Sequence, residues 1–145
     1  MDFKELLKDF MIDFPTRLAK FEQSALTAGL ELEKGISISE IHIISKIGPD
    51  GSKKMNQIAR QLGVTQPTLT AACDKLEAKG LIIRHRDPED KRVVNVQLTS
   101  EGLIAYSFHQ AMMDDLAERF IDGMSEEDMN KLSQKINQIY NYLSI

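Results

Sequence analysis

The chain has 145 residues, 42% of them hydrophobic and 28% charged, which is the size and composition of one globular domain. No run approaches the roughly 18 apolar residues that a membrane span needs, and the charged start lacks the apolar core of a signal peptide. A single cysteine excludes an internal disulfide framework and a four-cysteine zinc site. We therefore expect a soluble cytoplasmic protein without a cofactor.

The net charge of −4 is unevenly distributed along the chain. Residues 53–99 contain nine basic and five acidic side chains, a net charge of +4, so the remainder carries −8. A basic middle between acidic ends is typical of a protein in which one module meets a polyanion such as nucleic acid. Chance clustering on a solvated face is the alternative interpretation.

The first 50 residues predict two helices. Phenylalanines and leucines recur at steps of three and four from Phe3 to Phe21, which indicates one helix ending near Gly29, with a kink or break expected at Pro15. A second helix should start at Ser37 or Ser39. The sequence 37–40, Ser-Ile-Ser-Glu, has the form of a capping box, and the pair at 48–49, Gly-Pro, should end the helix.

Residues 55–80 have the pattern of a helix-turn-helix. A short amphipathic helix should end at Gly63, and a second helix should run from about Gln66 to Lys79 and end before Gly80. Thr65 suits the N-cap of the second helix, and Pro67 suits its first turn.

A β-hairpin and two more helices should complete the chain. After Gly80 the apolar period changes to two, and the runs 81–86 and 94–99 flank a polar tip at 87–91, which predicts a wing. The next helix carries an apolar stripe of Leu103, Tyr106, Met113, Leu116, Phe120 and Met124. Ser125 should cap the last helix, whose stripe is Met129, Leu132, Ile136, Ile139 and Leu143.

The second helix of a helix-turn-helix enters the major groove of DNA with its N-terminal residues on the base edges. We expect Leu69, Cys73 and Leu76 to face inward. The opposite side offers glutamine, which pairs with adenine, and threonines, which contact thymine methyls and phosphates. The alternative is an ordinary polar surface. The candidate DNA-binding residues of this helix are Thr65, Gln66, Thr68, Thr70 and Lys75.

The motif Asp90-x-Arg92-x5-Leu98-Thr99, with Arg86-Asp87-Pro88-Glu89 and residues 76–82 before it, resembles the signature of MarR-type winged helix-turn-helix regulators. The resemblance covers residues 37–102. It implies that Arg92 enters the minor groove, that Asp90 orients it and that Lys91 reaches the phosphate backbone. Ala71 departs from the family, which often has arginine or lysine there.

The resemblance also implies the architecture: a mainly α fold with a small β-hairpin wing. Residues 1–145 would form a single domain, with a winged helix-turn-helix DNA-binding lobe at 37–99 and a helical dimerisation lobe from 1–30 and 100–145. Such proteins are homodimers that bind near-palindromic double-stranded DNA, most often as repressors controlled by a small ligand or partner. Near the junction of the two lobes, where the family binds effectors, the candidate pocket residues are His42, His109 and Met113.

A narrower similarity concerns the effector. Residues 36–48 and 121–127 are similar to those of the fatty-acid-synthesis repressors of Gram-positive bacteria. That similarity implies acylated acyl carrier protein as corepressor, with methionine and phenylalanine side chains around the acyl chain. Ordinary core packing of those side chains is the alternative.

The sequence does not predict catalysis, metal binding or redox sensing. Known enzyme motifs are missing, so we expect no catalysis. The three histidines lie on three predicted elements without metal-ligand spacing, so no metal is expected. His42 and His109 could approach one another and line a pocket or pair with a carboxylate. Cys73 should serve packing and not redox sensing. A protein-interaction module that does not read DNA is the rival function.

Overall fold

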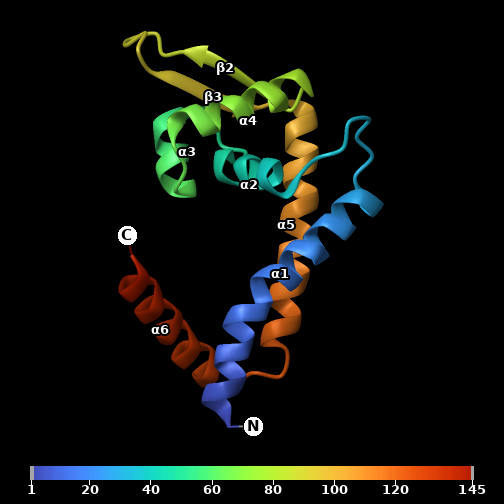
Figure 1. The fold of residues 1–145 in the computed structure, drawn as a ribbon, viewed down its shortest axis with the longest axis vertical. Helices are drawn as coiled ribbons and strands as arrows, with labels where there is room; N and C mark the ends of the chain where they lie inside the picture. The colour runs from blue at the N-terminus through green and yellow to red at the C-terminus, as the bar shows by residue number, and fades with distance from the viewer. Residues whose placement is uncertain (1, 145) are drawn as a thin grey trace. The chain divides into compact units, whose positions relative to one another are not determined.

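The computed structural model describes residues 2–144 and is mainly helical, with a small sheet (Figure 1). Its elements within that range are α1 (Phe3–Gly29), α2 (Ile38–Ile47), β1 (Lys53–Lys54), α3 (Met55–Leu62), α4 (Gln66–Ala78), β2 (Ile82–Arg86), β3 (Val94–Leu98), α5 (Ser100–Ile121) and α6 (Glu126–Leu143). The winged helix-turn-helix architecture is thereby confirmed. Among the residues described, no helix combines the length and hydropathy that crossing a bilayer requires.

Contacts divide the chain into two compact units, Met1–Ala111 and Met112–Ile145, and the boundary falls inside α5. The first unit contains the helix-turn-helix, the wing and the buried core. In the second unit, the Ser125 hydroxyl accepts a hydrogen bond from the Asp128 amide at 3.1 Å and caps α6, as predicted. The assignment of 1–30 and 100–145 to a dimerisation lobe stays a prediction.

The predicted capping box at the start of α2 is confirmed. The Glu40 amide donates to the Ser37 hydroxyl at 3.1 Å, and the Ser37 amide donates to the Glu40 carboxylate at 2.9 Å. This reciprocal pair satisfies two backbone groups that the first turn would otherwise leave without partners. It fixes where α2 begins, and α2 then buries four isoleucines in the core: Ile41, Ile43, Ile44 and Ile47.

The helix-turn-helix follows the sequence pattern closely. Gly63 ends α3 in the left-handed conformation, with φ 67° and ψ 31°, which glycine adopts without the steric cost of a Cβ. The Thr65 hydroxyl then accepts a hydrogen bond from the Thr68 amide at 3.3 Å and caps α4. The predicted inward stripe is confirmed, since Leu69, Cys73 and Leu76 are all buried.

The wing contains one strand more than the sequence predicted. β2 and β3 form the expected antiparallel hairpin, with Arg84 opposite Val96, and β1 adds to the other edge of β3 with Lys53 opposite Val96. Two consecutive lysines carry no apolar alternation, so the pattern could not reveal a strand that forms only because β3 offers it an edge. This contact ties the segment before α3 to the wing.

The apolar stripe predicted for α5 is not the face that this helix buries in the first unit, although Tyr106 of the stripe is partly buried against the core. Gly102, Ala105 and His109 are buried, whereas Leu103 keeps 38% of its surface exposed. The cause is a close backbone approach: a Cβ on Gly102 would overlap the carbonyl oxygen of Leu81. At this approach the small residues Gly102 and Ala105 therefore face inward, and a pattern of large apolar residues marks a different face.

The apolar stripe of α1 lies on an exposed surface. The helix continues through Pro15 without a break and buries only Glu22 and Leu26 among its described residues. Five residues of its stripe remain 37–75% exposed: Phe3, Leu7, Phe10, Phe14 and Phe21. A stripe of this kind is unusual on an isolated chain and is typical of a helix that meets a partner.

One largely buried ion pair positions the end of α4 against α2. The Lys79 ammonium lies 2.8 Å from the Glu40 carboxylate, whose side chain is 8% exposed. Burial alone would raise the pKa of Glu40, but Lys79 and the Ser37 hydrogen bonds outweigh that effect and hold the pKa below its ordinary value. The pair therefore contributes to stability while Glu40 is ionised.

Replacing Lys79 by methionine should destabilise the fold by about 1–3 kcal/mol at pH 7, because a buried carboxylate loses its partner. The pKa of Glu40 is lower in the folded state than in the unfolded state. The contribution of its ion pair to stability is therefore present above about pH 4.5 and is lost as the pH falls through the pKa of Glu40 in the folded state. The difference in unfolding free energy between wild type and variant should then shrink in acid. Urea unfolding at pH 7 and pH 3.5 measures it, with the exposed Lys75→Met as the control. An equal difference at both pH values would contradict this role.

Candidate nucleic-acid interface

The recognition helix α4 presents its predicted DNA-binding residues to solvent. Thr65, Gln66, Thr68, Thr70 and Lys75 are all exposed. The hydroxyls of Thr65 and Thr68 lie 2.8 Å apart and hydrogen-bond to one another at the N-terminus of α4. This bond fixes the two threonine side chains at the N-terminus of α4. A helix-turn-helix places this end of its second helix in the major groove.

The tip of the wing is held by a network of hydrogen bonds. The Asp87 carboxylate accepts from the amides of Glu89 and Asp90 at 2.9 and 3.2 Å, and from the Asn95 side chain at 3.1 Å. These bonds keep the pKa of Asp87 below its usual range, with the Asn95 contact the largest cause. Arg86 donates to the Lys91 carbonyl at 2.8 Å. Arg86 therefore braces the loop.

Arg92 projects from this braced tip with its charged group in solvent. Its side chain is 91% exposed, and its Nε and a terminal nitrogen donate to the two Asp90 oxygens at 3.0 and 3.1 Å. The guanidinium lowers the pKa of Asp90, and Asp90 raises that of Arg92, so both stay charged at neutral pH. The predicted orientation of Arg92 by Asp90 is seen in this geometry, and Lys91 beside them is exposed.

A shallow hollow of about 160 Å³ joins the recognition helix to the wing. Gln66 and Thr70 of α4 line it together with Arg92, although these residues are more than twenty positions apart in the chain. Asn56 of α3 also lines the hollow, although nothing in its local sequence pattern marks it as part of this surface. The structure thus brings three of the predicted residues to one surface.

Comparison with known proteins agrees with this geometry. Residues 36–94 match the sequence model of the MarR family. The HTH-type transcriptional repressor MdtR of Bacillus subtilis (strain 168) is 27% identical over 126 residues, covering 86% of this chain and 79% of MdtR. Streptococcus pneumoniae FabT, solved in complex with DNA, superposes with a TM-score of 0.83 at 29% identity, covering 97% of this chain and 96% of FabT. The transcriptional regulator BldR of Sulfolobus solfataricus superposes with a TM-score of 0.72 at 25% identity, covering 99% of this chain and 100% of BldR.

The helix-turn-helix and wing of this chain therefore match the MarR family of transcriptional regulators. MarR-family members are DNA-binding proteins and not enzymes, which agrees with the expectation of no catalysis. Two departures from the family pattern are visible in the structure. Ala71 is exposed on α4, where it offers no hydrogen bond to a base, and Lys54 occupies the N-cap of α3 without a side-chain hydrogen bond.

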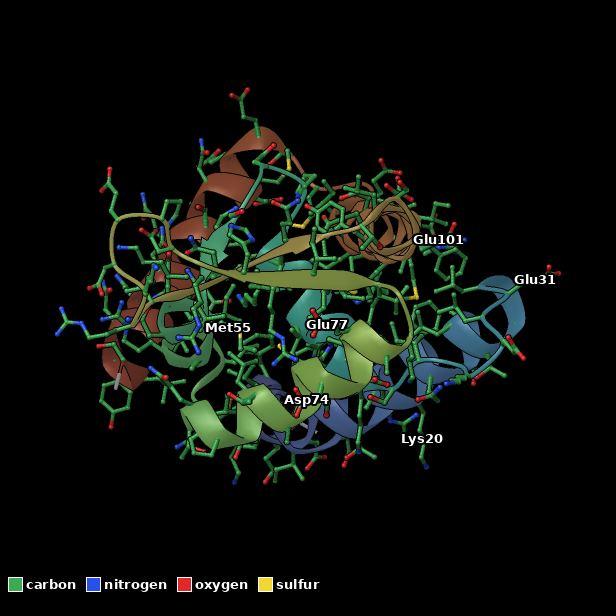
Figure 2. The ribbon with its side chains drawn as sticks, turned by 90° about the horizontal axis from the view of Figure 1, so that it is seen from above. Lys20, Glu31, Met55, Asp74, Glu77 and Glu101 are labelled. Atoms are coloured by element: carbon green, nitrogen blue, oxygen red, sulfur yellow. The ribbon has the colours of Figure 1, made fainter. Side chains whose placement is uncertain are left out.

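Arg84 is engaged within the fold, so the count of basic residues in 53–99 overstates the positive charge that this surface presents to solvent. Its guanidinium contacts Glu77 at 2.7 Å, and its backbone amide also donates to Glu77. It contacts Asp74 at 2.6 Å. Asp74 and Glu77 both lie on α4 (Figure 2). Arg84 thus clamps α4 to β2, and Lys79 is likewise engaged with Glu40.

Cys73 is a packing residue. It is 1% exposed, its sulfur lies 3.9 Å from the Met55 sulfur, and burial raises the pKa of its thiol to about 11. The thiolate, which is the reactive form, is therefore scarce at neutral pH. The expected inward position of Cys73 is confirmed.

Native protein should react with a disulfide reagent such as DTNB at least roughly 100-fold more slowly than the same protein in denaturant, because burial restricts access and suppresses the thiolate. Absorbance of the released thionitrobenzoate at pH 8 measures both rates. Unfolded protein supplies the control, with one reactive thiol per chain. Fast reaction of the folded chain would contradict a purely structural role for Cys73.

The structure brings His42 and His109 together, with ring centroids 5.9 Å apart. Between them lies Glu22, whose carboxylate is 2.9 Å from His42 Nε2 and 3.7 Å from His109 Nε2. The suggested carboxylate pairing of His42 is thus confirmed, whereas Glu22 itself was missed because it sits beside the aromatic stripe of α1. Burial lowers the pKa of His109, against the opposing charge of Glu22. Met113 belongs to the second unit and stays a predicted pocket residue.

Proposed function

We propose that this MarR-type protein is a homodimeric, sequence-specific regulator that represses transcription from the cytoplasm and is controlled by a small ligand or partner. The observation that carries the proposal is the surface on which Gln66 and Thr70 of α4 meet Arg92 of the wing. An α4 amide side chain suits an adenine edge in the major groove, and a projecting guanidinium suits a narrow minor groove. Thr65, Thr68, Lys75 and Lys91 complete the proposed contact to double-stranded DNA.

Dimerisation is supported by the exposed apolar stripe of α1. On α6, three large side chains are also 47–61% exposed: Ile136, Ile139 and Leu143. A second copy of the chain would remove such stripes from water, and burial of apolar area is the main favourable term in association. A two-fold dimer would present two recognition helices to a near-palindromic operator, with half-sites about 34–36 Å apart.

Control would act through the separation of the two recognition helices. A ligand shifts occupancy only by its differential affinity for the DNA-competent spacing. The proposed effector residues are His42, His109 and Met113. None of these three residues lines the hollow of about 440 Å³ that lies between the end of α1, the following loop and the Glu40–Lys79 pair. Dimer geometry that is identical with and without an effector, alongside a large change in affinity, would contradict this mechanism.

A second candidate concerns the effector. The resemblance of residues 36–48 and 121–127 to the fatty-acid-synthesis repressors suggests acylated acyl carrier protein as a corepressor, and the similarity to FabT over 97% of the chain is compatible with it. Adding acylated or unacylated carrier protein to the protein–DNA mixture tests it. Tighter operator binding with the acylated form alone would support this candidate, and equal binding with both forms would contradict it.

The decisive experiment is fluorescence anisotropy of the protein with its own upstream DNA over a range of salt, beside a scrambled duplex. A sequence-specific reader should prefer the native duplex and lose affinity steeply with salt, by a log–log slope of about −0.9 for each phosphate neutralised. Equal, weak binding to both duplexes that persists after addition of cell extract would favour a protein-interaction module instead.

A further inference from the structure

The structure assigns a divalent transition-metal site of the zinc class to the Glu22–His42–His109 cluster, formed by one carboxylate oxygen and two imidazole nitrogens. The three ligands come from α1, α2 and α5, and all belong to the first compact unit. Histidine spacing alone predicted no metal, because the carboxylate that completes the set lies twenty residues before His42.

The distances are those of a site that needs only a small closure. The three ligand atoms lie within 4.8 Å of one another. With metal–ligand bonds of 2.0–2.2 Å, tetrahedral ligands are about 3.4 Å apart. One Glu22 oxygen lies 2.9 Å from His42 Nε2, and the other lies 3.7 Å from His109 Nε2, on either side of that value. A rotation of the carboxylate that turns one oxygen toward both rings would therefore complete the set around an ion.

The Glu22 carboxylate and the His109 imidazole are buried without enough polar partners, and a bound cation would supply the missing interactions. The Glu22 side chain is 3% exposed, and that of His109 is 7% exposed. Neither ring nitrogen of His109 has a hydrogen-bond partner among residues 2–144. A buried carboxylate and an unpartnered imidazole are both costly. A divalent ion would neutralise the Glu22 carboxylate and bind a nitrogen of His109. Without an ion, His42 satisfies only one oxygen of Glu22.

Exposure on one side gives the ion a way in. The His42 side chain is 46% exposed, while the other two ligands are buried. Water could therefore occupy the fourth position of a tetrahedral site with three protein ligands. The imidazole–carboxylate set suits zinc and its neighbours in the first transition row better than Mg²⁺ or Ca²⁺, which prefer oxygen.

The test is zinc binding by tag-free protein stripped with a chelator, followed by calorimetry and competition with a chromophoric chelator. We expect one Zn²⁺ per chain and at least a tenfold loss of affinity in Glu22→Gln and in His42→Ala. His85→Ala is the matched control, because this histidine is exposed on β2, and it should bind like wild type. Co²⁺ should give the visible absorption of a tetrahedral site in wild type and lose it in Glu22→Gln.

Thermal unfolding guards against variants that simply fail to fold. Zn²⁺ should raise the melting temperature of wild type and His85→Ala, because a ligand that binds only the folded state stabilises it. A folded Glu22→Gln should show no such rise. Absence of stoichiometric zinc binding, or equal zinc affinity in wild type and Glu22→Gln, would contradict the proposed metal site. The cluster would then be an internal hydrogen-bonded pair of Glu22 and His42.

An ion held by α1, α2 and α5 would tie the helix-turn-helix to the helices outside it. This consequence rests on the proposed function: Zn²⁺ should change the affinity for the upstream duplex in wild type and not in Glu22→Gln. The binding and unfolding assays contain no DNA. Failure of the metal site and failure of DNA recognition are therefore distinguishable.

Discussion

Replacing Arg92 by alanine should weaken binding to the upstream duplex by about 1–3 kcal/mol, or roughly 5- to 150-fold. The Arg92 side chain is 91% exposed, and two of its guanidinium nitrogens donate to Asp90, so the group is preorganised at the wing tip. A narrow A·T-rich minor groove concentrates negative potential and rewards an inserted arginine. Anisotropy at a fixed salt concentration measures the loss, and the melting temperature should stay unchanged.

Two further variants separate this contact from a loss of charge in general. Arg119→Ala on α5 removes another exposed arginine that is paired with a carboxylate at 3.0 Å, and it should bind DNA like wild type. Lys91→Ala should weaken binding to all duplexes equally and reduce the salt slope by about one contact. The loss in Arg92→Ala should instead depend on the sequence beneath the wing. Unchanged affinity in Arg92→Ala would show that the wing does not enter a groove.

Local signals predicted most of the fold because the features that decide it are themselves local. The capping box at Ser37–Glu40, the glycine at 63, the threonine cap at 65 and the change of period after Gly80 each concern residues a few positions apart. The contact between Asp90 and Arg92 was implied by the family resemblance, and it too joins residues two positions apart. Such signals survive in a single sequence.

The features that were missed depend on residues far apart in the chain. β1 exists because β3 offers an edge more than forty residues later. Glu22 acquires its neighbours only when α1, α2 and α5 pack together. The basic count for 53–99 could not show that Arg84 and Lys79 are used internally. In each case the partner is set by tertiary packing, which no periodicity encodes.

Replacing Gly102 by alanine should destabilise the fold by about 1–3 kcal/mol, a cost typical of overpacking. At an open helical position the same change stabilises by nearly 1 kcal/mol, so the sign itself is diagnostic. The added methyl would overlap the Leu81 carbonyl oxygen. That oxygen accepts a hydrogen bond from the Thr99 amide at 3.1 Å, and Leu81 is fully buried. The backbone therefore cannot move aside without breaking the junction between β3 and α5.

Gly29→Ala is the matched control, because its methyl would meet the tip of the Phe108 ring at 2.5 Å and not a backbone atom. The Phe108 side chain is only partly buried and can rotate away, so this variant should lose much less stability. Urea unfolding of both variants beside wild type measures the difference. A Gly102→Ala protein as stable as wild type would mean that α5 can slide away from Leu81, and that the close approach does not fix how this helix leaves the wing.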